Sequence, residues 1–160
     1  MRPRTQIWLG AALGVVWALV LVFGMQAAGL RYLAAPVALP GAWLGPALSV
    51  ALLLGVLGLR RAVGRQGADL MMAPGSRGDT DLRVLNDTAA QAVLALLLWP
   101  LVAMVQGGAL ALALGGSFLA ARLVFWIGAH VSPFLRALGS AATAFPTILA
   151  ALWAGFVWFF

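Results

Sequence analysis

The chain has 160 residues, of which 64% are hydrophobic and only 9% charged, with a formal net charge of +6. Soluble domains carry about 25% charged residues, so a mean hydropathy of +1.03 excludes an ordinary soluble domain and indicates a protein covered by lipid. Because there is no cysteine and only one histidine, disulfides, thiol nucleophiles and thiolate metal sites are excluded, and a zinc site is disfavoured.

In chain order, five apolar stretches are long enough to cross a bilayer as helices, which takes about 20 residues each. They are residues 7–30, 42–59, 89–105, 109–129 and 135–160. The second begins after Pro40-Gly41, and a Ser-Pro-Phe turn at 132–134 separates the last two, so that the last begins at Leu135 or Arg136. The sequence therefore predicts an all-α integral membrane protein with five spans.

A polar segment, residues 66–81, is the only long loop that the sequence predicts, and it precedes the third span. We expect the helix of that span to begin near Thr80, with Thr80 or Asp81 as its N-cap. The alternative for the first span is a cleaved signal peptide, because MRPRTQ resembles a basic leader. Its apolar run is longer than the usual 7 to 15 residues and ends at no A-x-A site, which favours a retained helix.

The distribution of arginine predicts the orientation, because cytoplasmic loops of membrane proteins are rich in basic residues. With the N-terminus inside, eight arginines are cytoplasmic and one, Arg31, is outside. The eight are Arg2, Arg4, Arg60, Arg61, Arg65, Arg77, Arg83 and Arg136. We therefore attribute the net positive charge to membrane topology and expect no nucleic-acid partner.

Arg122 lies among apolar residues in the fourth span, about two turns from its predicted cytoplasmic end. A charge in mid-bilayer costs about 2.5 to 3.5 kcal/mol, so it needs a partner or a function. Asp87, which shares a helix face with Arg83, lies at a similar depth and is the candidate partner. The sequence leaves open whether this is a structural ion pair or part of an anion site.

The other basic residues at predicted cytoplasmic helix ends are Arg60, Arg61 and Arg136, a pattern typical of topology signals and contacts with membrane lipids. We expect His130 to be a loop or interface residue. If the arginines converge at this side of the membrane, the zone suits an anionic, amphipathic ligand with a carboxylate on the arginines and an apolar tail in the bilayer.

Several motifs resemble the MAPEG family, the membrane-associated proteins of eicosanoid and glutathione metabolism. LRRAVGR (59–65) is similar to the arginine-rich exit of the family's first helix, and a proline-bearing loop follows. RVLNDTAAQAVL (83–94) resembles its second-helix signature, and ARLVFWIGAHVSPFLRALGSAATAFPTILAALWAGF (121–156) resembles the third and fourth helices of bacterial members. The resemblance covers residues 42–160, so residues 1–41 would be an additional N-terminal helix and outer loop before a four-helix domain.

This resemblance implies a homotrimer in the bacterial inner membrane that binds glutathione between subunits and uses it against lipophilic electrophiles, as a transferase or peroxidase. It implies that Arg136 stabilises the glutathione thiolate. It also implies that Arg83 and Arg122 match the second- and third-helix arginines, and that Arg60 and Arg61 match basic residues at the end of the first core helix. The expected ligand-binding residues are Arg60, Arg61, Arg83, Asp87 and Arg122.

The sequence departs from the family pattern at four positions. Asp87 stands where the family has asparagine, Ala90 where it has a glutamate, and Phe125 and Ala129 where glutathione-using members have tyrosine or another polar group. These departures favour an alternative, a catalytically inactive MAPEG-fold protein that binds an anionic lipid or a partner. A small transporter is a third hypothesis, which the lack of a paired repeat disfavours.

Overall fold

Five helices make up this computed structural model, which describes residues 3–29, 33–63 and 73–160. They are α1 (Pro3–Ala27), α2 (Ala35–Val63), α4 (Arg77–Gln106), α5 (Gly108–Val131) and α6 (Pro133–Phe159). Each contains a stretch long and apolar enough to cross a membrane, so the chain is a multi-pass integral membrane protein. The predicted all-helical architecture with five spans is confirmed.

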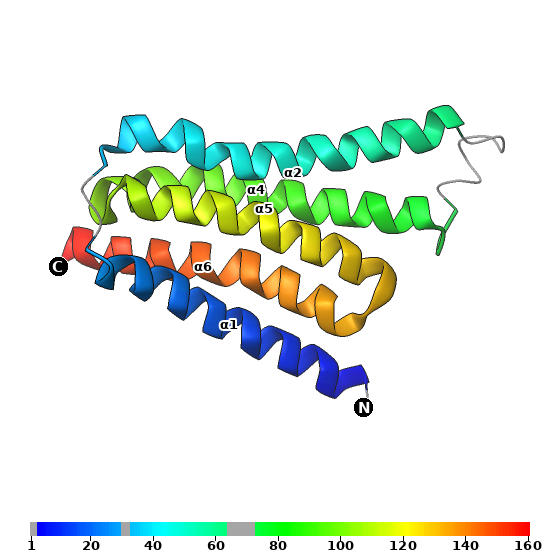
Figure 1. The fold of residues 1–160 in the computed structure, drawn as a ribbon, viewed down its shortest axis with the longest axis horizontal. Helices are drawn as coiled ribbons and strands as arrows, with labels where there is room; N and C mark the ends of the chain where they lie inside the picture. Colours follow the sequence, from blue (N-terminus) through cyan, green and yellow to red (C-terminus); the bar gives the residue numbers. More distant parts are fainter. Residues whose placement is uncertain (1–2, 30–32, 64–72) are drawn as a thin grey trace.

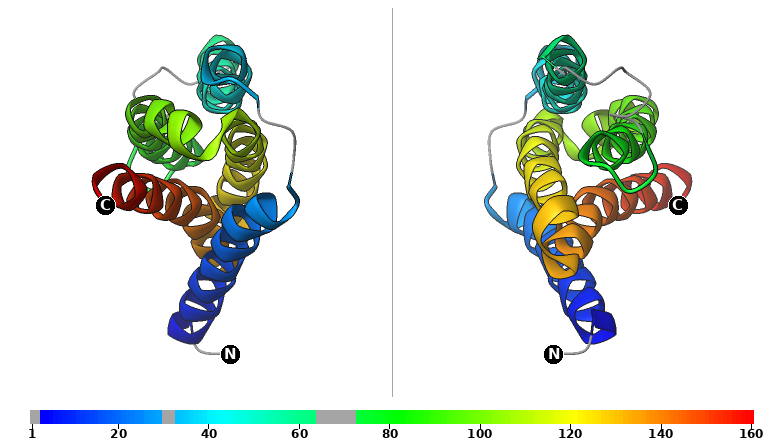
Figure 2. Two further views of the ribbon diagram at one scale, coloured as in Figure 1. Left: turned by 90° about the vertical axis from the view of Figure 1, so that its left-hand side faces the viewer. Right: turned by 90° about the vertical axis from the view of Figure 1, so that its right-hand side faces the viewer.

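The helices run side by side along the long axis of the molecule (Figure 1). Helices α4 and α5 pack against each other; α2 lies against both of them on one side, and α6 lies against both on another. Helix α1 packs along α6, with a smaller contact to α5, and lies on the side of the bundle away from α2 (Figure 2). The first helix is therefore an outer layer on the α5–α6 side of the other four.

Small residues allow these helices to approach closely, as the GAALG and GGALALALGG motifs predict. A side chain at Gly10 or Gly14 of α1 would collide with α6, and one at Gly115 of α5 would collide with the backbone of α2. Nothing lies within 4 Å of the space beside Gly116, so this glycine of the second motif makes no close helix contact. The buried core beside these contacts includes Trp99, whose indole donates to the Thr147 hydroxyl at 3.3 Å.

Helix α4 begins before the predicted N-cap, so the assignment of Thr80 or Asp81 to that position was wrong. The N-cap is Ser76, whose hydroxyl accepts a hydrogen bond from the Asp79 backbone N–H at 3.1 Å. The Asp79 carboxylate accepts in turn from the Gly75 N–H at 2.9 Å. This reciprocal arrangement resembles a capping box. The negative charge of Asp79 in the first turn also interacts favourably with the helix dipole.

Two further helices begin earlier than the sequence predicts. In both, a proline that was expected to precede the helix is part of it. Helix α2 begins at Ala35, not at 42, and contains Pro40 and Pro46 in its interior. Proline is tolerated inside membrane helices, where neighbouring groups satisfy the freed carbonyls. Helix α6 begins at Pro133, since proline at the first helical position has a fixed φ suited to a helix and needs no N–H partner.

Candidate functional site

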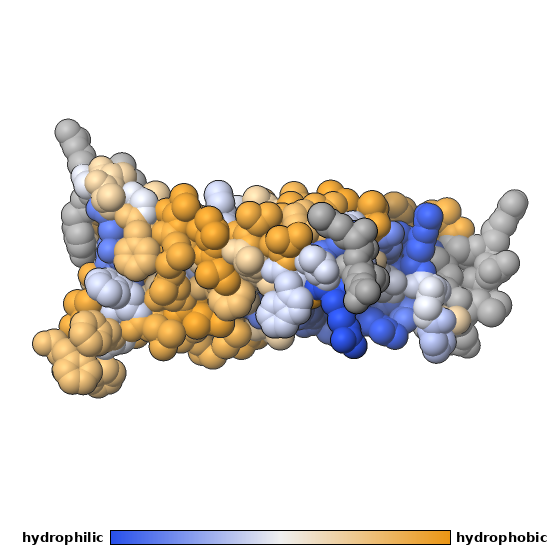
Figure 3. All heavy atoms as spheres, turned by 90° about the horizontal axis from the view of Figure 1, so that it is seen from below, coloured by the Kyte–Doolittle hydropathy of each residue, from blue (hydrophilic) through white to orange (hydrophobic). Residues whose placement is uncertain are grey.

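Polar side chains gather at one end of the bundle, where α1, α4 and α6 begin and where α2 and α5 end (Figure 1). In the space-filling view the hydrophilic residues concentrate toward this end, and apolar residues cover most of the remaining length (Figure 3). Every arginine and aspartate in the described ranges belongs to a helix segment near this end. Arg2, Arg31 and Arg65, which the topology argument also used, lie outside the described residues.

The ion pair expected between α4 and α5 is present. Arg122 Nη1 lies 2.5 Å from Asp87 Oδ2, and the Arg122 side chain is only 2% exposed. The rings of Phe118 and Phe125 flank the guanidinium, with centroids 5.6 and 5.0 Å from its central carbon. Favourable cation–π contacts therefore add to the ion pair with Asp87, but Nε and Nη2 of Arg122 have no hydrogen-bond partner among the described residues.

Arg83 pairs within its own helix. Its Nη2 lies 3.0 Å from Asp79 Oδ2, and its Nε donates to Asp79 Oδ1 at 3.2 Å. The spacing of four residues brings the two side chains together on one face of α4. The Arg83 side chain is 70% exposed, so this pair is accessible from the charged end.

A fully buried acid, Asp81, joins three helices, although the sequence indicated only a helix cap at this position. Its carboxylate is fully buried; Oδ1 accepts a hydrogen bond from Trp126 Nε1 at 2.7 Å, and His130 Nε2 of α5 lies 2.7 Å from the same oxygen. Arg60 Nε of α2 lies 2.8 Å from Oδ2, although the two groups are not aligned as a hydrogen bond. We call these four residues the Asp81 cluster.

The structure places His130 and Arg60 in the Asp81 cluster. His130 belongs to the last turn of α5 and lies beside a buried acid, so it is not a loop residue. Arg60 is held in this cluster and does not line the cavity described below, and Arg61 is exposed beside it. A signal for the cluster is visible in the sequence, because Trp126 and His130 are four residues apart and so share one face of a helix.

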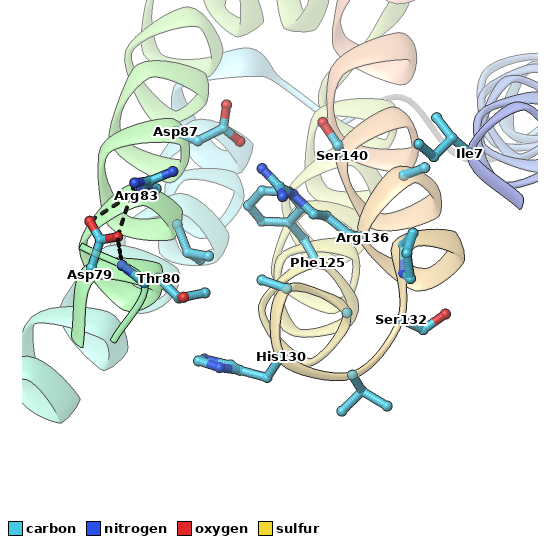
Figure 4. A pocket seen from close by; sticks show the side chains of 17 residues that line it. Ile7, Asp79, Thr80, Arg83, Asp87, Phe125, His130, Ser132, Arg136 and Ser140 are labelled. Atoms are coloured by element: carbon cyan, nitrogen blue, oxygen red, sulfur yellow. Dashed lines mark hydrogen bonds and ion pairs between the residues drawn. The ribbon is translucent and has the colours of Figure 1, made fainter. Parts of the chain in front are cut away.

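A cavity of about 710 Å³ opens between α4, α5 and α6 at the charged end, with Ile7 of α1 at its edge. Of the residues predicted from the sequence, Arg83, Asp87 and Arg136 line it (Figure 4). Arg122 does not line the cavity but binds Asp87, which does. Phe125 and Ala129 also line it, so together with Asp87 three of the four departures from the MAPEG pattern face this space.

Arg136 is the unneutralised charge of the cavity. Asp79 is paired with Arg83, and Asp87 with Arg122, whereas Arg136 makes no ion pair within the described part of the chain. In the close-up its guanidinium projects from the first turns of α6 into the space between Asp87 and Phe125 (Figure 4). The geometry suits an anionic group; among the residues described, no cluster of three or more metal-ligating side chains is present.

Comparison of the chain with protein-family models, with curated proteins and with solved structures finds no match.

Proposed function

We propose that this protein binds an anionic, amphipathic ligand in the cavity at the charged end of the bundle, with Arg136 as its principal contact. The observation that carries the proposal is that the Arg136 guanidinium has no ion-pair partner in the described ranges and lines a cavity whose two carboxylates are already neutralised. Arg136 is exposed, so an anion that enters this space can reach its guanidinium and is attracted by the positive charge. Arginine also offers several donors in a planar arrangement that suits carboxylate, phosphate and thiolate groups.

The lining supports a ligand with both polar and apolar parts. Ser132 and Ser140 offer hydroxyls, whereas Ile7, Val84 and Phe125 offer apolar surface. The outer surface of the helices carries exposed leucine, valine and phenylalanine along the rest of their length. A ligand with an apolar tail would therefore bind its head in the cavity and extend its tail toward lipid.

Glutathione is the first candidate, and the proposal for it comes from the MAPEG resemblance together with this geometry. Arg136 corresponds to the arginine that stabilises the glutathione thiolate in that family, and a guanidinium favours a thiolate over a thiol. The activity would then be a glutathione-dependent transfer to, or peroxidase reaction on, a lipophilic electrophile. The same resemblance underlies our proposals of a homotrimer and of a bacterial inner-membrane location with the charged end in the cytoplasm.

The second candidate is an anion-binding protein without this chemistry. Phe125 and Ala129 face the cavity and supply no hydroxyl to a tripeptide, and the Asp87 carboxylate is already engaged by Arg122. Under this alternative the occupant of the Arg136 site is an anionic lipid headgroup.

Calorimetry in lipid nanodiscs separates the two candidates. For the first, we expect glutathione to bind with a Kd of about 1 mM or lower, equivalent to roughly −4 kcal/mol, and Arg136→Ala to abolish the heat. Arg61→Ala is the matched control, because Arg61 is exposed and does not line the cavity. No heat with glutathione, together with anionic lipid that copurifies with the wild type and not with Arg136→Ala, supports the second. If neither ligand depends on Arg136, the proposed function is wrong.

A further inference from the structure

The Asp81 cluster places the histidine of this chain between a buried carboxylate and the cavity. His130 lines the cavity, and its Nε2 lies 2.7 Å from Oδ1 of the fully buried Asp81. The other ring nitrogen, Nδ1, makes no hydrogen bond within residues 3–29, 33–63 and 73–160. One nitrogen is thus fixed by the protein, and the other is left to accept a hydrogen bond or a proton.

Charged groups from three helices lie around the imidazole ring. Arg60 of α2 already supplies a permanent positive charge 2.8 Å from Asp81, so the buried carboxylate does not require a charged His130. An ionised carboxylate can only accept hydrogen bonds, so Nε2 carries the hydrogen and Nδ1 presents its lone pair. The other charged groups facing the cavity are the Asp79–Arg83 pair and Asp87 of α4 and Arg136 of α6.

We propose that His130 is the proton acceptor of this cavity and that Asp81 is its positioning residue. When a thiol ligand binds, its S–H bond breaks, the proton moves to His130 Nδ1 and the electron pair stays on sulfur. The resulting imidazolium is stabilised by Asp81 through Nε2–H, and the thiolate is stabilised by Arg136. The thiol as ligand rests on the proposed function, whereas the arrangement of the dyad does not depend on any ligand.

The acceptor arrangement is measured directly because His130 is the one histidine of the sequence. The protein is labelled with ¹⁵N-histidine, purified through a histidine-free tag and examined by NMR in nanodiscs at about pH 8, where imidazole is normally neutral. We expect a neutral ring in the Nε2–H form. A ring that is protonated at this pH, or one in the Nδ1–H form, overturns the proposal.

The role of Asp81 is tested in the same spectra. Asp81→Asn removes the charge but keeps a side chain of the same shape, and we expect a mixture of the two ring tautomers because an amide can either donate or accept. Asp79→Asn is the matched control, since Asp79 lies in the same helix but pairs with Arg83, and it should leave the Nε2–H form unchanged. An unaltered tautomer in Asp81→Asn shows that Asp81 does not position the ring.

Proton transfer is tested with glutathione through the ultraviolet absorbance of its thiolate across a pH series. We expect His130→Gln to bind glutathione while the thiolate forms only at higher pH, because the proton then has to leave for the solvent. Binding with an unchanged pH profile overturns the proton-acceptor role. If glutathione does not bind to the wild type at all, the proposed function is wrong for this ligand. The NMR measurement then tests by itself whether Asp81 holds His130 in the Nε2–H form.

Discussion

Arg122 and Asp87 form an ion pair whose two members are buried to very different extents. The Arg122 side chain is 2% exposed and the Asp87 side chain is 44% exposed, although Nη1 and Oδ2 are only 2.5 Å apart. The acid therefore keeps contact with the cavity at the charged end, and the cation depends on that acid for its counter-charge. We therefore expect substitutions of the two partners to lower the free energy of unfolding by different amounts.

Removal of the acid should cost more than removal of the base. Asp87→Ala leaves a buried guanidinium without its counter-ion, and we expect the free energy of unfolding to fall by about 3 kcal/mol. Arg122→Met keeps most of the volume, leaves Asp87 able to reach water, and should cost about 1 kcal/mol or less. Unfolding by titration from a mild detergent into dodecyl sulfate measures both changes.

The double variant Asp87→Ala/Arg122→Met provides the control. We expect its stability to match that of Arg122→Met alone, because the cost of the buried charge disappears with the charge. Equal losses for the two single variants would show instead that the inequality in burial has no energetic consequence.

The Asp81 cluster should contribute more to stability than the Asp79–Arg83 pair on the same helix. Asp81→Ala leaves Arg60 without a counter-charge and the Trp126 and His130 donors without an acceptor, and we expect a loss of about 3 kcal/mol. Asp79→Asn should cost much less, because its partner Arg83 is 70% exposed. The same detergent titration compares them, and similar losses would contradict a structural role for the buried acid.

The spans and the Asp87–Arg122 pair could be predicted from the sequence because each follows from the cost of placing a polar group in lipid. Long apolar runs must be helices, and a lone arginine in such a run needs an acid at similar depth. The approximate depth of Asp87 along its helix is sufficient to identify it as the partner of Arg122. These features depend on local composition and on the direction in which each helix crosses the membrane, and both can be inferred from the sequence.

The Asp81 cluster could not be predicted in the same way, because it depends on how three helices are rotated about their axes. Asp81 follows a polar loop and has the residue type of a helix cap, so its burial becomes evident only when α2 and α5 are placed beside α4. The observed cap is indicated in the sequence by the spacing of Ser76 and Asp79. The rotation of each helix about its axis also decides which arginines line the cavity. Arg136 lines it, whereas Arg60 points to Asp81 instead.

Helix α1 should dissociate from α6 when its glycine face is filled. A side chain at Gly14 would collide with Ala141 and the α6 backbone, whereas the space beside Gly24 on the same helix has no atom within 4 Å. Leu13 and Leu138 line one apolar cavity of about 290 Å³ between α1, α5 and α6, and the chain has no cysteine of its own. A cysteine pair at these two positions can therefore report on the α1–α6 contact through a short bifunctional cross-linker.

We expect Gly14→Leu to abolish the cross-link between the cysteines at 13 and 138, and Gly24→Leu to leave its yield unchanged. Loss of the cross-link in both variants would indicate that any added leucine disturbs α1. Retention in both would show that the close packing at Gly14 does not hold the two helices together.

The arginine distribution predicts that the charged end of the bundle faces the cytoplasm, and single cysteines introduced into this cysteine-free chain can test it. Pro74 and Ser132 lie at the charged end, and Ala28 and Ala34 lie at the opposite end, near the junction of α1 and α2. In intact cells we expect a membrane-impermeant maleimide to label cysteines at 28 and 34, and to label those at 74 and 132 only after permeabilisation. The reverse pattern would mean that the N-terminus is outside and that Arg136 faces the wrong compartment for cytoplasmic glutathione. Labelling of both groups from one side would contradict the five-span topology itself, because α1, α2, α4, α5 and α6 would then not all cross the membrane.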